Sequence, residues 1–579
     1  MNKTMKKSLT TLVLSAALLT SAAYPAWASE PAASEAPIAA QAVASYPLSG
    51  SIEVELKSLL NEHESDSTKL GAVIRLKNTG SKLTRVPDFE LRVRTADGVE
   101  YTLEPSSKNP KAVKGKSEQE LSYLSTVDRI DDVTLTDISW VDVDLEVYPK
   151  KETTLLTLPL DPSMVWNGVD STITNQGAIL KWGEPFTLPS LHSSIVFRPI
   201  DIHKEITAKG VSTVVQIQAE NPTDERQNVP NFAIDGKTES SVYSGSRAES
   251  SVTLEAGEKK YVHVVIPTDL DTEFTSLNVV TPEKFATAAG EESYRVGRIN
   301  ILLPAGAATQ GVIPAPSYTL GTPVRLDSTN KFIPSNVEIS LEELHISGND
   351  DDAFNTAVAK FKVTNNSDRP LPIPNIQTEL ISKDGYSYIG TRQANTASAV
   401  VPKASYIVSY AFSLPASETG EGLKMNLYST QTTADTTYKS LLATAKVPVQ
   451  KEESDDSVLK MYPYNVNIRD WSITALFQPT SFLYNYKLKL DLDIEQDKAV
   501  TVDANTSKLQ FDLYDNDGNR VGSTTEALAG TNRLYNGTNT ISLNVNSGQL
   551  DFPLTVKIYE VFTTAAGDTA KRFLTEFKQ

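Results

Sequence analysis

The stretch Ala72-Val73-Ile74-Arg75-Leu76-Lys77-Asn78-Thr79-Gly80 ends in an Asn followed by a small polar turn. In an extended chain, Val73, Arg75 and Lys77 lie on one face, and Ile74 and Leu76 lie on the other. The same pattern returns in Val214-Val215-Gln216-Ile217-Gln218-Ala219-Glu220-Asn221-Pro222-Thr223 and in Ala359-Lys360-Phe361-Lys362-Val363-Thr364-Asn365-Asn366-Ser367. Alternation of this kind predicts a β-strand that is repeated along the chain.

A second motif follows each of these strands at a constant distance. It is found as Val86-Pro87-Asp88-Phe89, Val229-Pro230-Asn231-Phe232 and Ile373-Pro374-Asn375-Ile376. The Asn landmark recurs after 143 and then 144 residues, and so does the last residue of the second motif. Two landmarks that keep one spacing indicate an internal duplication.

Turn signals separate further alternating runs. Asp97-Gly98 and Asp384-Gly385 have the composition of hairpin turns. A fourth and more divergent unit carries the longest alternation, with apolar side chains on one face at Phe482, Tyr484, Tyr486, Leu488, Leu490, Leu492 and Ile494. Helical periodicity is rare, and one short helix is predicted over residues 282–289. These features predict an all-β chain of sandwiches.

The order of strand, Asn turn, Pro-Asp/Asn-Phe, strand, Asp-Gly, strand and Pro resembles a family of bacterial extracellular immunoglobulin-like domains of largely unknown function. The resemblance covers three units well and the fourth loosely. It implies tandem immunoglobulin-like β-sandwich domains connected by Pro-rich linkers, and it implies little about activity. The predicted domains are 51–165, 195–304, 336–450 and the divergent 465–579, with connectors 166–194 and 305–335 and a linker 451–464.

The first residues have the three parts of a secretory signal peptide. A basic start at residues 1–7 precedes an apolar run at residues 12–19 and the cleavage pattern Ala26-Trp27-Ala28. The apolar run is shorter than the roughly 20 residues that cross a bilayer, which disfavours the alternative of an uncleaved anchor. We therefore expect a signal peptide at 1–28, a flexible Ala/Pro/Ser leader at 29–50, and no membrane insertion. The predicted location is extracellular, either free or non-covalently associated with a cell wall.

Composition narrows the class of protein. The chain has no Cys, so its stability depends on packed cores rather than on disulfides. An exported protein without Cys is typical of bacteria. Its formal net charge of −18 disfavours binding to nucleic acid through a basic surface. The same charge is typical of a soluble protein.

Two acidic loops are candidate calcium sites. Asp515, Asp517 and Asn519 stand at alternate positions, and Glu526 is the twelfth residue of the loop, a spacing that offers oxygen ligands to Ca²⁺. Arg520 stands where a calcium loop needs Gly, so the alternative is a polar hairpin turn. Residues 350–352 are three consecutive Asp, which predict either an interdomain calcium site or a solvated loop.

Two tryptophans in the first connector are candidate contacts for a glycan. Trp166 and Trp182 lie outside the clearest strands, and sugar rings stack on exposed aromatic faces. The alternative is that both side chains cap a sandwich and fix the angle between domains, because aromatic residues bury large areas.

No catalytic motif is recognisable, and the five His residues lack zinc-ligand spacing. Two groups of alternating acids could serve a hydrolase or simply face water: Asp142, Asp144, Glu146, Asp491, Asp493 and Glu495. The favoured hypothesis is a non-enzymatic scaffold or adhesion protein with an unidentified protein or polysaccharide partner. The alternatives are a polysaccharide-binding protein and a carboxylate-type hydrolase, and calcium is the one cofactor that the sequence suggests.

Overall fold

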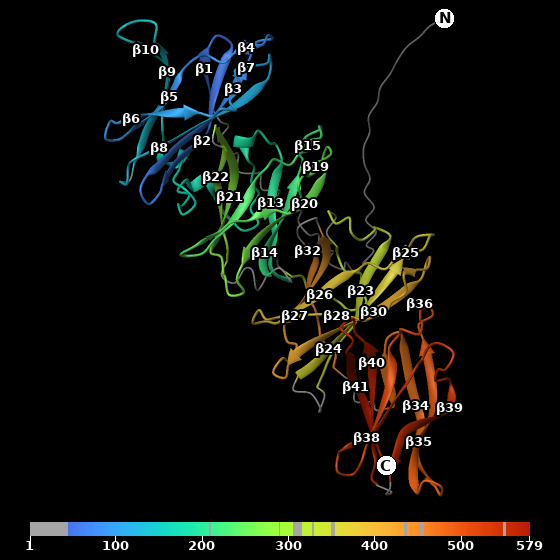
Figure 1. Ribbon diagram of the computed structural model, residues 1–579. Coiled ribbons are helices and arrows are strands. Elements are labelled where there is room, and N and C mark those ends of the chain that lie inside the picture. Colours follow the sequence, from blue (N-terminus) through green and yellow to red (C-terminus); the bar gives the residue numbers. More distant parts are fainter. Residues whose placement is uncertain are drawn as a thin grey trace, which may run out of the picture.

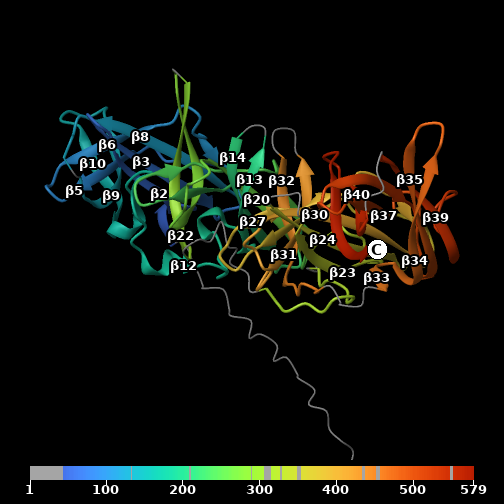
Figure 2. The ribbon, with the colours of Figure 1, turned by 90° about the horizontal axis from the view of Figure 1, so that it is seen from below.

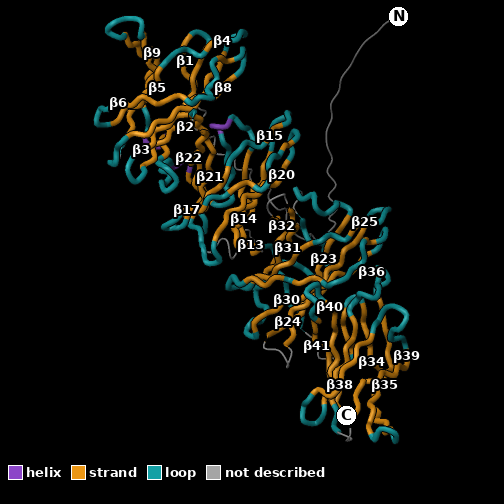
Figure 3. Tube along the Cα trace, in the orientation of Figure 1, coloured by secondary structure: helices purple, strands orange, loops and turns teal. Residues whose placement is uncertain are grey.

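The computed structural model describes residues 44–131, 133–207, 210–288, 290–304, 315–326, 329–348, 354–432, 437–451, 457–547 and 552–579. The predicted signal peptide, most of the leader and the acidic run 350–352 lie outside these residues. The chain is all-β and forms four β-sandwich units that follow one another in a row (Figure 1). Seen from below, the first and fourth units lie at opposite ends of this row (Figure 2). Among the described residues, helical structure is limited to short turns (Figure 3).

Unit 1 combines its strands in the order β1-β2-β3-β8-β6-β5-β9-β10, with β6 linking the two layers and β4 pairing β7 separately. Its strands are β1 (Ser45–Ser49), β2 (Ile52–His63), β3 (Thr68–Asn78), β4 (Thr84–Arg85), β5 (Glu90–Thr95), β6 (Glu100–Pro105), β7 (Ala112–Val113), β8 (Glu118–Val127), β9 (Leu135–Asp144) and β10 (Lys151–Pro159). Strand β1 pairs with β2, so the end of the stretch predicted as a flexible leader belongs to a sheet.

The connector between units 1 and 2 is fastened to both of them. It contains the 3-10 turns η1 (Pro162–Met164), η2 (Gln176–Ala178) and η3 (Pro189–Leu191) and the short strands β11 (Val165–Trp166) and β12 (Ile179–Lys181). Strand β11 pairs in parallel with β2 of unit 1, and β12 pairs in parallel with β22 of unit 2.

Unit 2 packs the sheet β13-β14-β20-β18 against the sheet β12-β22-β21-β16-β17, with a separate β15-β19 pair. Its strands are β13 (Val196–Thr207), β14 (Gly210–Glu220), β15 (Gln227–Asn228), β16 (Ala233–Lys237), β17 (Val242–Tyr243), β18 (Ser246–Arg247), β19 (Thr253–Leu254), β20 (Lys259–Thr268), β21 (Ser276–Thr287) and β22 (Gly290–Leu302).

Unit 3 repeats this plan with the sheets β23-β24-β30-β28 and β27-β26-β31-β32 and a β25-β29 pair. Its strands are β23 (Val337–Gly348), β24 (Phe354–Asn365), β25 (Leu371–Pro372), β26 (Ile376–Ile381), β27 (Ser387–Ile389), β28 (Thr391–Arg392), β29 (Ala399–Val400), β30 (Ser405–Pro415), β31 (Lys424–Thr432) and β32 (Thr437–Lys446).

Unit 4 packs the sheet β33-β34-β35-β39 against the sheet β38-β37-β40-β41, while its short strand β36 pairs with β30 of unit 3. Its strands are β33 (Val458–Met461), β34 (Tyr464–Gln478), β35 (Leu483–Gln496), β36 (Val500–Thr501), β37 (Lys508–Tyr514), β38 (Arg520–Glu526), β39 (Gly537–Ser547), β40 (Thr555–Thr563) and β41 (Thr569–Lys578).

The repeated Asn has the same structural role in units 1–3. Asn78 is the last residue of β3, Asn365 is the last residue of β24, and Asn221 directly follows β14. All three side chains are fully buried. Each amide nitrogen donates to the carbonyl four residues later, at 2.7, 2.7 and 2.8 Å, and also to a carbonyl across the sandwich. Each amide oxygen accepts the N–H two residues later. This set of bonds satisfies buried backbone groups at the turn, which explains why Asn recurs there.

The predicted alternation in unit 4 is confirmed along β35. Tyr486, Leu488 and Leu490 are buried in the core, while Lys487 and Lys489 are exposed. Phe482 does not belong to this strand, because it lies in the preceding turn with a φ of 57° and is 74% exposed.

The short helix predicted over residues 282–289 is wrong. Residues 282–287 belong to β21, which pairs with β22 along its length. Strand β16 pairs with β21 only as far as Val280, so the missing N–H of Pro282 falls where no ladder partner on that side requires it. Pairing across the sheet therefore outweighs the local composition.

No helix in the described part of the chain has the length and apolar character that a membrane crossing requires.

Candidate functional site: a groove at the first junction

A groove of about 960 Å³ lies where unit 1, the connector and unit 2 meet. One wall is formed by β2 residues 56–59, another by β22 residues 296–299, and connector residues between 162 and 190 line the remaining sides. The volume falls within the range of sites that hold small ligands, and such sites are frequent at domain boundaries.

Trp166 is part of the wall of this groove, yet its side chain is only 5% exposed. Its backbone pairs with Leu60 of β2, and its ring packs on Gly297 of β22, where a Cβ atom would overlap the ring. The ring belongs to an apolar cluster that joins the two units, composed of Leu60, Leu124, Trp166, Ile173, Phe285 and Val296. In this position Trp166 fixes the two units to each other and offers little ring surface to a sugar.

Trp182 lies elsewhere and does not line the groove. It is half-buried and packs against the core of unit 2. The structure therefore separates the two tryptophans that the sequence suggested as partners in one glycan site.

A network of charges shared by both units borders the groove. Lys57 Nζ lies 3.0 Å from Glu283 Oε2 and 2.8 Å from Glu120 Oε2. Arg298 donates to the Lys57 carbonyl at 2.9 Å and lies 3.2 Å from Glu283 Oε1, to which the Ser58 hydroxyl also donates. Burial lowers the pKa of Arg298. Burial also opposes ionisation of Glu120, but Lys57 and Arg75 together outweigh it and hold the pKa of Glu120 below its usual range.

A second group of charges extends this network toward the connector. Arg75 lies 2.8 Å from Glu120 and donates to the Ser190 carbonyl at 2.8 Å. His192, at the end of η3, lies 2.9 Å from Glu55 and 3.0 Å from Glu118. Lys57, Ser58 and Arg298 line the groove, so a ligand there meets two cations whose charge is already largely balanced. Such a site favours hydroxyl-rich or mixed-charge ligands over a bare anion.

The second junction joins β13 and β14 of unit 2 to β31 and β32 of unit 3. The fully buried Gln216 accepts the Leu441 N–H at 2.7 Å and donates to the Leu441 carbonyl at 3.3 Å. Two histidines of unit 2 lie against tyrosines of unit 3, with ring centroids 4.5 Å apart for His263 and Tyr438. Tyr438 also donates to Glu249 at 3.1 Å.

The third junction is closed by buried ion pairs. Lys360, with a side chain that is 0% exposed, lies 3.0 Å from Glu343 in its own unit and 2.5 Å from Glu560 of unit 4. Arg572 of unit 4 lies 3.1 Å from Glu560 and 3.3 Å from Glu343. Burial raises the pKa of Glu343, but Lys360 and Arg572 outweigh burial and hold the pKa below its usual range. The Tyr462 N–H also donates to Glu343 at 2.8 Å.

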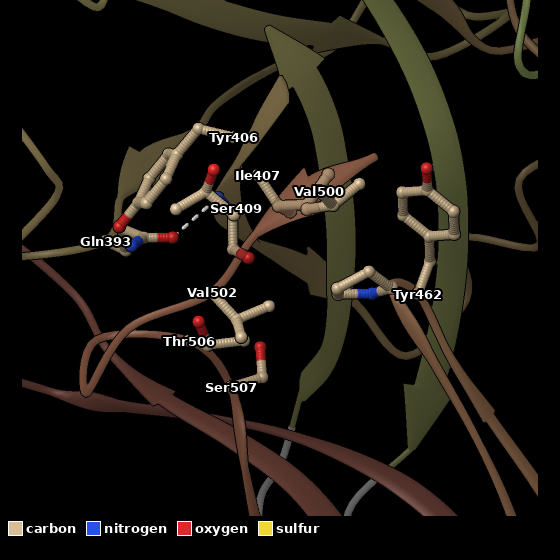
Figure 4. A pocket seen from close by; sticks show the side chains of 11 residues that line it. Gln393, Tyr406, Ile407, Ser409, Tyr462, Val500, Val502, Thr506 and Ser507 are labelled. Carbon is tan, nitrogen blue, oxygen red and sulfur yellow. Dashed lines mark hydrogen bonds between the residues drawn. The ribbon is translucent and has the colours of Figure 1, made fainter. Parts of the chain in front are cut away.

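Beside these ion pairs, side chains of both units leave a cavity of only about 10 Å³ (Figure 4). Gln393 accepts the Ser409 N–H at 2.8 Å on one side of it. Tyr406 donates to Asp503 at 3.2 Å, and burial, together with that carboxylate, raises the pKa of Tyr406 to about 12. The space is that of about one water molecule, so this cavity has no room for a larger ligand.

The predicted calcium loop forms a hairpin turn. Asp515 Oδ1 accepts the N–H groups of Asp517 and Asn519 at 2.9 and 2.8 Å, and Asn519 Nδ2 donates to Asp515 Oδ2. Glu526 lies at the far end of β38, six residues and roughly 20 Å from Arg520. The turn thus uses the oxygens of Asp515 for its own backbone and does not bring Glu526 to them. Within the described ranges, no group of three or more His, Asp or Glu side chains is arranged to hold a metal ion.

The structure places the two sets of alternating acids in different units. Asp142 and Asp144 are exposed in β9, and Glu146 follows in the hairpin loop. Asp491 and Asp493 lie in β35 of unit 4, where Asp493 is 2.6 Å from Arg469. The two sets therefore lie in different units, at β9 of unit 1 and β35 of unit 4.

Sequence reasoning missed the residues that form the junctions. Alternation correctly placed Arg75 on the face opposite Ile74, but a polar outward residue gives no sign that another unit will cover it. Lys360, Gln216 and Val73 occupy the same place in three units, opposite Glu343, Asp201 and Ser58. Because their chemistry differs, no conserved motif marks the junction. A comparison of the chain with protein-family models and with curated proteins finds no match.

Proposed function

We propose that this chain is a non-enzymatic structural and interaction protein of the bacterial cell surface or its surroundings, built from immunoglobulin-like sandwiches. The observation that supports this proposal is that every junction is held by buried polar side chains from both units. Lys57, Gln216 and Lys360 each bond across a junction. Junctions of this kind hold a row of units at fixed angles, as a scaffold requires.

Small-angle X-ray scattering of the purified chain tests the scaffold. A single extended shape that fits the row of four units is expected, and the matched variant Lys360→Met should broaden the distribution of shapes. A wild-type chain that already samples many shapes would reject the proposal, because it could not hold its ends at a fixed separation. Lys403→Met, at an exposed lysine of unit 3, is the control.

A second proposed function is binding of a polysaccharide, such as a cell-wall glycan, in the groove at the first junction. It is supported by the groove's volume and by the hydroxyl, amide and charged groups that line it, among them Ser58, Asn167, Thr172 and Arg298. The proposed contact is this polar lining, with Trp166 as a positioning residue behind it.

Cosedimentation with isolated cell walls, with and without calcium, tests this second function. We expect Thr174→Trp to fill the groove and remove most of the retained protein, because Thr174 is an exposed lining residue. Thr419→Trp, at an exposed loop of unit 3, should leave retention unchanged. Equal retention of both variants would place the wall contact outside the groove, and a dependence on calcium would point to the acidic loops.

A further inference from the structure

The three junctions use the same elements of each unit. The outer face of the sheet that contains β3, β14 or β24 is covered by the last hairpin of the following unit, which is β21–β22, β31–β32 or β40–β41. The strand that precedes β3, β14, β24 or β35 in the chain and pairs with it has a β-bulge at the same place in all four units: Leu56/Ser58, Pro199/Asp201, Leu341/Glu343 and Ile468/Asp470. Unit 4 therefore has the same face, and unit 1 has the same hairpin.

The free hairpin of unit 1 is β9–β10. Its own bulge, at Thr154/Leu156, aligns it with the hairpins of units 2, 3 and 4, and places Asp142 where those units have Thr281, Ser429 and Glu560. The three equivalents are buried in junctions, whereas Asp142 is exposed. Two residues further on, Asp144 stands at the position of Phe562, which packs with Val358 across the third junction.

The free face of unit 4 is formed by β34, β35 and β39. Asp470 pairs with Asp491, at the place where unit 3 has Glu343 and Lys360. Two residues along β35, the exposed Lys489 stands at the position of Val358. If a β9–β10 hairpin docks here as β40–β41 docks on unit 3, Asp144 meets Lys489 and Asp142 meets Asp491.

Exposed apolar side chains mark the tips of both elements. The β9–β10 loop exposes Leu145, Val147 and Tyr148, the last of them fully. The β34–β35 hairpin exposes Leu476, Phe477 and Phe482. At the first junction the corresponding tips lie together, because Lys69 near the tip of β2–β3 is 2.8 Å from Glu292 near the tip of β21–β22. The same docking mode would bring the two apolar tips side by side.

We propose that the β9–β10 hairpin and the β34–β35–β39 face are two halves of one more junction, and that the occupant of each is a second copy of this chain. The two elements lie at opposite ends of the row in both views (Figures 1 and 2). An interface between different surfaces of identical molecules adds copies head to tail, which gives an open filament unless the rotation between copies closes a ring. The tip contacts and the Asp144–Lys489 pair favour this junction, and the Asp142–Asp491 pair opposes it and keeps it weak.

A charge swap tests the proposed contact in the full chain. Sedimentation velocity over a concentration series should show reversible growth for the wild type. Asp144→Lys and Lys489→Asp should each raise the dissociation constant at least ~10-fold through like charges, and the double swap should restore growth. Growth that is unaffected by either single change, or not restored by the double change, would overturn the proposal.

The like-charged pair Asp142–Asp491 provides a second test, in which a substitution should strengthen the association instead of weakening it. Asp491→Lys places at the centre of the face the cation that Lys360 supplies at the third junction, so it should lower the dissociation constant at least ~10-fold. Asp517→Lys, with the same charge change in the β37–β38 turn, should have no effect. All of the substituted residues are at least partly exposed, and thermal unfolding checks that each variant folds. A chain that stays monomeric both as wild type and as Asp491→Lys refutes the head-to-tail junction, without affecting the scaffold or groove proposals.

Discussion

The first and third junctions are made by the same elements and differ in what they enclose. At the third junction Lys360, Glu560 and Arg572 form buried ion pairs, and the cavity described beside them has space for about one water molecule. At the first junction a long connector lies between the units, and a groove of about 960 Å³ remains beside the ion pairs. The difference shows that a single docking mode gives a closed joint when the link is short and leaves a groove when the connector forms part of the wall.

Removing the central lysine should break the third junction more severely than the first. Lys360→Met leaves Glu343 and Glu560 buried with one cation between them, and we expect a loss of about 3–5 kcal/mol in the free energy of unfolding. Lys57→Met should cost less, because the buried Glu283 keeps Arg298 as a partner and the other partner, Glu120, has a side chain that is 41% exposed and can be solvated. Denaturant unfolding of both variants measures the difference, and equal losses would contradict the distinction between closed and open junctions.

A substitution at Gly297 should sharpen the comparison by deforming only the open junction. Gly297→Ala places a methyl group against the ring of Trp166, and we expect a cost of about 1–3 kcal/mol and a red shift of tryptophan fluorescence as the ring is displaced. Gly177→Ala is the matched control, since Gly177 also lines the groove but has space for a Cβ atom. An unchanged spectrum for Gly297→Ala would show that the ring is not held between the units.

Acid should weaken the third junction in a defined direction. The pKa of Glu343 is lowered in the folded chain, so the unfolded chain binds more protons in acid. The stability that Glu343 contributes is complete above its ordinary pKa of about 4.3 and is lost as the pH falls through its lower folded-state value. Glu343→Gln should remove this part of the pH dependence of the unfolding free energy between pH 5 and pH 2 (about one ionisation). An identical slope in the variant would mean that Glu343 does not ionise in the junction.

The sequence predicted the fold well, because the fold depends on local alternation and on turns. Ile74 and Leu76 are buried as the pattern requires, and the repeated Asn marks a turn that its side chain holds together. The short helix over residues 282–289 was wrong because pairing of β21 with β22 is a long-range effect that composition does not contain.

The candidate site was predicted less well, for a physical reason. Burial of Lys57 depends on Glu283, and burial of Lys360 depends on Glu560. Each partner is about 200 residues away in the chain, so a local sequence pattern does not reveal it. A charged residue at an outward strand position has the same sequence pattern whether water or another unit covers it. The position of Trp166 in the connector did identify the first junction, although its ring is used for packing.

The connector stores chain length. Residues 160–195 would span roughly 120 Å if drawn straight. They are folded between the units and fastened by the parallel pairs β11–β2 and β12–β22. We expect a pull on the two ends of the chain to break these pairings of two and three residues before the longer ladders of the sandwiches, and each break would lengthen the chain. The first junction would therefore open under tension while the cores of units 1 and 2 remain folded.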